Sequence, residues 1–111
     1  DQFAAARAVL QAGVFIPATV LIEVAWVLGS RYAMSRDDIA KILTEFLDLP
    51  MIAVDEPELT GWALQRFREG ADFADMIHLV ASRRADAFVT FDRSLYRAAG
   101  PSAPLPVELL R

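Results

Sequence analysis

Apolar residues recur at helical spacing in several segments of the chain. In residues 1–13, Phe3, Ala6 and Val9 fall on one face, and Gly13 is a natural stop. The same spacing, bounded by capping residues and glycines, marks the other helical segments. The predicted helices cover residues 1–13, 19–32, 35–47, 57–70, 72–82 and 93–100.

Short apolar runs between these helices predict strands at 14–19, 51–55 and 86–92. Pro17 has no N–H to donate, so the first of these strands should end there. The tail 101–111 could add an edge strand. Strands that alternate with helices in this way predict an α/β fold, a three-layer α/β/α sandwich with a mainly parallel sheet.

Composition agrees with one folded domain over residues 1–111. The apolar content is 55%, there is no cysteine and the formal charge is −4. Without cysteine neither a disulfide framework nor a thiolate metal site can form, which fits a cytoplasmic protein. The segment from Ala8 to Ser30 contains one charged residue, but Gly13 and Pro17 break it into pieces too short to span a membrane.

Carboxylates lie where a parallel sheet places its functional groups, beyond the carboxyl ends of the strands. Glu23 follows the first strand on a helix that is apolar nearly all round and is therefore predicted to be buried on most sides. A charge buried there needs an arginine, a capping donor or a cation. A salt bridge and a metal site both remain open for Glu23.

Asp72 and Asp75 stand three residues apart at the start of a predicted helix. Helix capping explains Asp72 well and Asp75 less well, because Asp reaches back poorly to a cap. Asp92 ends the strand "AFVTF" and could likewise cap the next helix. The Thr90 hydroxyl points to the same side of that strand and could orient the Asp92 carboxylate or a bound water.

Three acids that open a helix or close a strand of one sheet would converge on one place. Clustered carboxylates repel one another, so at least one should have a raised pKa unless a cation neutralises them. Hard oxygen ligands favour Mg²⁺ or Mn²⁺, which can position a phosphodiester and activate water for attack. We therefore predict that Glu23, Asp75 and Asp92 form a metal site.

Two segments, "VFIPATVLIEVAWVL" and "GADFADMIHLVASRRADAFVTFDRSL", resemble the PIN-domain ribonucleases, specifically VapC-type toxins of toxin–antitoxin systems. The resemblance covers nearly the whole chain. It implies a Mg²⁺- or Mn²⁺-dependent endoribonuclease with Glu23, Asp75 and Asp92 as the acidic cluster and Thr90 beside the last acid. It also implies an RNA substrate, a homodimer, and a cognate antitoxin protein whose arginine reaches the acidic pocket.

The chain departs from this family at its start. PIN domains begin with a central strand that ends in an Asp, whereas Asp1 opens a predicted helix. We therefore expect a fragment that lacks its N-terminal strand. The missing acid leaves an alternative function open, that of a non-catalytic PIN-like module that binds a partner protein.

The remaining candidate residues can also be explained by packing or by solvent exposure alone. His78 lies one turn after Asp75 and is predicted to be a packed or hydrogen-bonded core residue. Trp26, Tyr32, Trp62 and the first helix could form a dimer surface. RNA contacts would come from Arg31, Arg83, Arg84, Arg93 and Arg97, each of which could equally be a solvated surface residue.

Overall fold

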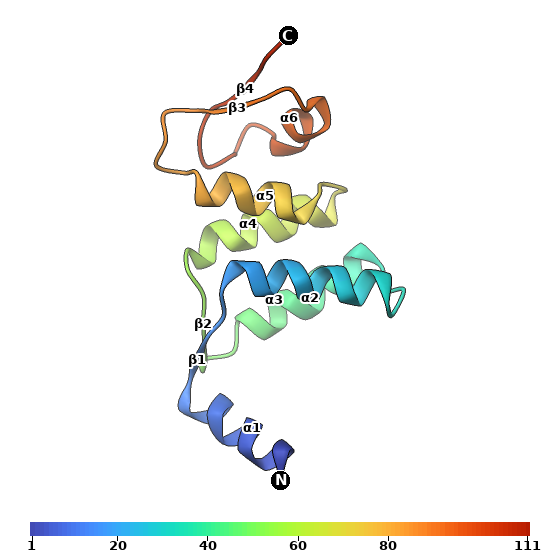
Figure 1. The fold of residues 1–111 in the computed structure, drawn as a ribbon, viewed down its shortest axis with the longest axis vertical. Coiled ribbons are helices and arrows are strands. Elements are labelled where there is room, and N and C mark those ends of the chain that lie inside the picture. The colour runs from blue at the N-terminus through green and yellow to red at the C-terminus, as the bar shows by residue number, and fades with distance from the viewer.

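The computed structural model describes all residues from 1 to 111 and contains six helices and four short strands (Figure 1). The helices are α1 (Gln2–Ala12), α2 (Ala18–Ser30), α3 (Arg36–Leu47), α4 (Pro57–Arg68), α5 (Phe73–Ala81) and α6 (Arg93–Ala99). The strands are β1 (Val14–Phe15), β2 (Ile52–Ala53), β3 (Phe88–Thr90) and β4 (Val107–Leu109). Each predicted helix and strand is present, although the strands are shorter than predicted.

The strands pair in two separate parallel sheets. In the first sheet β1 pairs with β2, and Val14 lies opposite Ile52. In the second, β3 pairs with β4, and Phe88 lies opposite Val107. The α/β class with parallel strands is therefore confirmed. The three-layer sandwich is not, because no strand joins β1 to β3 and each sheet has only two strands.

Local capping signals start and end the helices. The Ser35 Oγ accepts a hydrogen bond of 3.1 Å from the Asp38 N–H at the start of α3. The Asp72 Oδ1 accepts one of 2.9 Å from the Asp75 N–H at the start of α5. Gly13 follows α1 with φ at 100°, a conformation that only glycine adopts at little cost. The predicted caps at Ser35 and Asp72 are confirmed.

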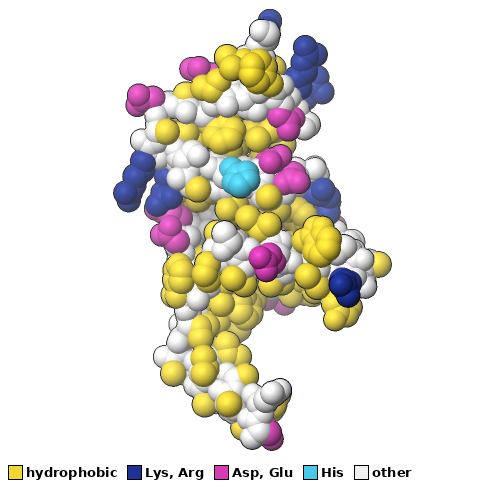
Figure 2. Space-filling view, viewed as in Figure 1, with side chains coloured by type: hydrophobic (Ala, Val, Ile, Leu, Met, Phe, Trp, Pro, Cys, Tyr) yellow, Lys and Arg dark blue, Asp and Glu magenta, His cyan; other side chains and the backbone are white.

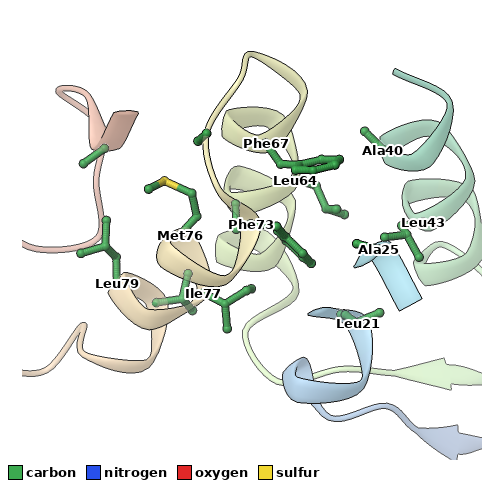
Figure 3. Packing of buried hydrophobic residues seen from close by; sticks show 14 of the residues in the cluster. Leu21, Ala25, Ala40, Leu43, Leu64, Phe67, Phe73, Met76, Ile77 and Leu79 are labelled. Carbon is green, nitrogen blue, oxygen red and sulfur yellow. The ribbon is translucent and has the colours of Figure 1, made fainter. Parts of the chain in front are cut away.

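The hydrophobic core lies mainly among α2, α3, α4 and α5 (Figure 3). Leu21, Met76 and Leu79 are its most deeply buried large side chains, with 1% or less of each exposed. The rings of Phe67 and Phe73 lie 5.7 Å apart at an angle of 56°, and Figure 3 shows both directed toward α2 and α3. The core thus fixes where α5 begins, which matters for the carboxylates there.

Helix α2 is much less buried than its sequence predicts. Only Leu21 and Ala25 are buried, whereas Trp26 is 66% exposed. The prediction that α2 is covered on most sides is wrong, because only one of its faces packs against other helices. No helix of the chain combines the length and the apolar character needed to cross a membrane.

Helix α1 lies at one end of an extended molecule (Figure 1). It contributes no buried residue. The radius of gyration is 15.4 Å, whereas a compact domain of this length has about 13 Å. The apolar side chains left exposed on α1, β1 and α2, and just beyond α2, are Phe3, Val9, Leu10, Phe15, Val20, Val24, Trp26, Val27 and Tyr32.

We expect Leu79→Ala to lower the free energy of unfolding by about 2–5 kcal/mol, because it leaves a cavity in a packed core. The matched control is Leu10→Ala, since Leu10 is also helical but 41% exposed. The control should change stability by no more than about 0.5 kcal/mol. Urea denaturation measures both, and equal losses would contradict the packing described for α5.

Candidate acidic site

The turn between α4 and α5 places two carboxylates at the start of α5. Gly70 has φ at 118°, which lets the chain reverse direction after α4. The Ala71 N–H then donates to the Arg66 carbonyl at 2.9 Å, and Asp72 caps the new helix. Asp75 stands in the first turn, where the helix dipole favours negative charge.

Arg36 holds this turn from the neighbouring helix α3. Its Nη1 donates to the Phe67 carbonyl at 2.7 Å and to the Ala71 carbonyl at 2.6 Å. Its guanidinium also lies 4.7 Å from the centre of the Phe67 ring, which adds a cation–π contact. Arg36, Asp72 and Asp75 line a hollow of about 210 Å³, which we call the acidic hollow.

Asp92 joins this region from the end of β3. Its N–H donates to the Thr90 Oγ1 at 2.9 Å, so the Thr90 hydroxyl does help to fix Asp92, through its backbone. The Asp92 Oδ1 accepts from the Ser94 N–H at 2.9 Å, the Ser94 hydroxyl at 2.6 Å and the Leu95 N–H at 3.1 Å. Asp92 therefore caps α6 with one oxygen, and no protein donor contacts the other.

The pKa values show that the two elements share one electrostatic field. Burial raises the pKa of Asp75, and the negative charges of Asp72 and Asp92 raise it further, while His78 opposes this shift. The Ser94 hydroxyl is the main cause of a lowered pKa at Asp92, followed by the Leu95 and Ser94 N–H groups, while burial acts against the shift. A raised pKa is thus found at Asp75, as predicted, although burial and not like-charge repulsion is its main cause.

Two residues that were predicted to be buried, Glu23 and His78, are exposed. Glu23 is exposed on α2, forms no salt bridge and is not among the charges that act on Asp75. As an exposed carboxylate it needs no buried partner. His78 is also exposed, so the prediction that it packs in the core is wrong. Figure 2 shows acidic side chains beside the single histidine, over α5.

The structure therefore brings Asp75 and Asp92 into one field with Asp72. Glu23 lies on α2, whose Ile22 and Trp26 line a hollow with Asp72, but its charge is not among those that act on Asp75. The carboxylate oxygens of the three aspartates are metal ligands that suit a hard divalent cation. However, no group of three or more Asp, Glu, His or Cys side chains is arranged to hold a metal ion. The metal site of Glu23, Asp75 and Asp92 stays a prediction, and the present arrangement lacks a complete set of ligands.

Sequence reasoning missed two residues of this region. Ser94 follows Asp92 in "DRS", and an Asp followed by Ser at the start of a helix was an available signal for this capping contact. Arg36 carried no comparable signal, because its acceptors lie 31 and 35 residues away in the sequence. Long-range contacts of this kind leave no periodic pattern.

Comparison with known proteins gives one result. The family model described as PIN domain matches residues 1–101. No curated protein and no solved structure matches the chain significantly. The matched range includes all the residues of the acidic region described above.

We expect Asp72→Asn and Asp92→Asn each to lower the pKa of Asp75, because each removes a negative charge that acts on it. Glu23→Gln is the matched control and should leave that pKa where it is. NMR titration of the Asp75 carboxyl carbon measures all three variants. An equal fall with Glu23→Gln would show that Glu23 belongs to the cluster after all.

The raised pKa of Asp75 also makes stability depend on pH. The folded protein binds this proton more tightly than the unfolded chain, so the free energy of unfolding falls as the pH rises from the ordinary value of 3.8 through the raised pKa. Asp75→Asn has no proton to lose there. Its stability relative to the native protein should therefore be higher at pH 7 than at pH 3, as measured by urea denaturation; a difference that shrinks with rising pH would contradict this.

Proposed function

Because the chain belongs to the PIN domain family, generally a nuclease fold, we propose that it is a metal-dependent endoribonuclease, the toxin of a type II toxin–antitoxin system. The observation that carries this proposal is that Asp72 and Asp75 line one hollow and that the charges of Asp72 and Asp92 both act on Asp75. Carboxylates that repel one another are typical of a cation site.

In this proposal Glu23, Asp75 and Asp92 bind the metal, and Thr90 positions Asp92. Mg²⁺ or Mn²⁺ would suit these oxygens, and such an ion orients a phosphodiester and activates water for in-line attack. The uncontacted oxygen of Asp92 supports its role, since capping α6 uses only Oδ1. A bound cation would neutralise the negative charges that repel one another at Asp75, and this relief of repulsion would favour its binding.

We propose that a further strand fits between β1 and β3 and supplies one more acid. Such a strand would join the two sheets into the single sheet of a three-layer sandwich. Its support is that β1 and β3 each pair with only one strand, which leaves an edge open on both. A complete sheet would also change the packing of α2, which carries Glu23.

Protein partners belong to the same proposal. An exposed apolar surface on a protein is typical of an interaction site. The segment from α1 to Tyr32 carries nine of the fifteen large apolar side chains that are exposed in this chain. We propose that this surface serves homodimerisation, with Trp26 and Tyr32 among its contacts. A cytoplasmic antitoxin would place an arginine against the acidic hollow, where a charged pair is favourable.

A second candidate is a non-catalytic PIN-like module that binds a partner protein. The observation that favours it is the absence of any grouped set of three metal ligands. The two candidates differ in a direct measurement, since a nuclease must bind Mg²⁺ or Mn²⁺ and a binding module need not. Partner binding without cation binding would favour the module.

We expect the full-length native protein to cleave single-stranded RNA with Mg²⁺ or Mn²⁺ and not with EDTA. Asp75→Asn and Asp92→Asn should each lower the cleavage rate about 100-fold or more, because a catalytic metal supplies several kcal/mol. A gel assay with end-labelled RNA measures the rate.

The matched control for this test is Asp86→Asn, since Asp86 is an exposed aspartate just before β3, at the opposite end from Asp92. It should keep the native rate. Native rates in both Asp75→Asn and Asp92→Asn would refute the nuclease assignment.

A further inference from the structure

The arginines of the chain divide into those with protein partners and those without. Arg36, Arg66, Arg68 and Arg83 donate to carbonyl or carboxylate oxygens, and Arg7 lies over the Phe3 ring. The arginines without a hydrogen bond, ion pair or ring contact are Arg31, Arg84, Arg93, Arg97 and Arg111. These side chains have their full charge available for a ligand.

Three of these free arginines meet at one place. Arg93, Arg97 and Arg111 line a hollow of about 500 Å³ together with Tyr96 and Leu109, which we call the arginine hollow. It lies between α6 and β4, and Figure 2 shows Lys and Arg side chains gathered at that end of the molecule. Three guanidinium groups without a counter-charge predict a ligand with several negative charges.

Tyr96 adds an aromatic surface to these charges. It is 46% exposed, and it also lines an adjacent hollow of about 720 Å³ beside Pro106. A half-exposed aromatic ring beside arginines is the arrangement that binds single-stranded nucleic acid, because a base stacks on the ring while phosphates pair with the guanidinium groups.

The arginine hollow and the acidic hollow each share lining residues with a third hollow. This third hollow, of about 380 Å³, shares Arg97 with the first and shares Gly70 and Ser94 with the second. Ser94 in turn donates to Asp92. The three hollows therefore form a series from Arg111 to Asp75, with arginines at one end and carboxylates at the other.

We propose that Arg93, Arg97, Arg111 and Tyr96 bind the phosphate backbone of a single-stranded RNA and lead it toward Asp92 and Asp75. This inference rests on the proposed function, which supplies the reason for an RNA substrate. A wholly acidic peptide fits the surface less well, because the acidic hollow repels its far end. An RNA also offers bases that can stack on the exposed Tyr96 ring, and a peptide of acidic side chains has none.

Binding of a fluorescein-labelled oligouridylate of about ten nucleotides, measured by anisotropy in EDTA, tests the site without cleavage. Arg97→Gln with Arg111→Gln should weaken binding at least about tenfold and reduce the salt slope by about 1.4, since each phosphate contact on a single strand contributes about 0.7. The matched control is Arg7→Gln with Arg68→Gln, which removes equal charge from exposed side chains that line neither hollow and should change affinity by no more than about twofold. Melting temperatures confirm that both variants fold.

Tyr96→Ala should weaken binding at least about fivefold, and Tyr96→Phe should restore it, because stacking needs the ring and not the hydroxyl. Equal losses in the two double-arginine variants would overturn the proposal, because the effect would then be general electrostatic attraction. It would also be overturned if Arg97→Gln with Arg111→Gln lost affinity for an oligoglutamate peptide but not for RNA.

The cleavage assay separates this inference from the function on which it rests. Suppose that Asp92→Asn loses cleavage while Arg97→Gln with Arg111→Gln binds RNA as tightly as the native protein. This result would overturn the arginine site and leave the nuclease assignment intact. If Arg97→Gln with Arg111→Gln loses RNA binding and the native protein does not cleave RNA with any cation, the arginine site would be supported and the nuclease assignment refuted.

Discussion

The position of the acidic region depends on the side chain of Arg36. Carbonyls at the end of a helix have no partner within it, and the Phe67 carbonyl in the last turn of α4 accepts instead from the Gly70 N–H at 3.0 Å and from Arg36. Arg36 joins this carbonyl to the Ala71 carbonyl through one nitrogen, Nη1. Because Asp72 follows Ala71 directly, the contact fixes where α5 starts and therefore where Asp75 lies.

Capping and ligand binding are compatible at the aspartates of this region. Asp72 caps α5 through Oδ1, and Asp92 caps α6 through Oδ1. Each carboxylate has a second oxygen that no protein donor occupies. The capping interpretation and the functional interpretation of these residues therefore describe different atoms, and evidence for one is no evidence against the other.

The sequence predicted the local features well and the long-range ones poorly. The caps at Ser35 and Asp72 depend on residues three positions apart, so the pattern was sufficient. The exposure of Trp26 and His78 depends on what covers α2 and α5, and no periodicity contains that information. The same holds for Arg36, whose partners come from a different helix. Asp75 and Asp92 were predicted to converge because parallel strands share an edge, but Asp75 follows no strand, and its coupling to Asp92 comes from the packing of α5 beside α6, which Asp92 caps.

The lack of buried side chains on α1 has a consequence for how the protein unfolds. A helix of eleven residues is marginal in water when nothing packs against it, and α1 has only its Asp1 cap and its own hydrogen bonds. Its backbone amides should therefore exchange with solvent without unfolding of the remainder. The cooperative unit begins at β1, where the Val14 N–H donates to the Met51 carbonyl and first ties the chain to a distant segment.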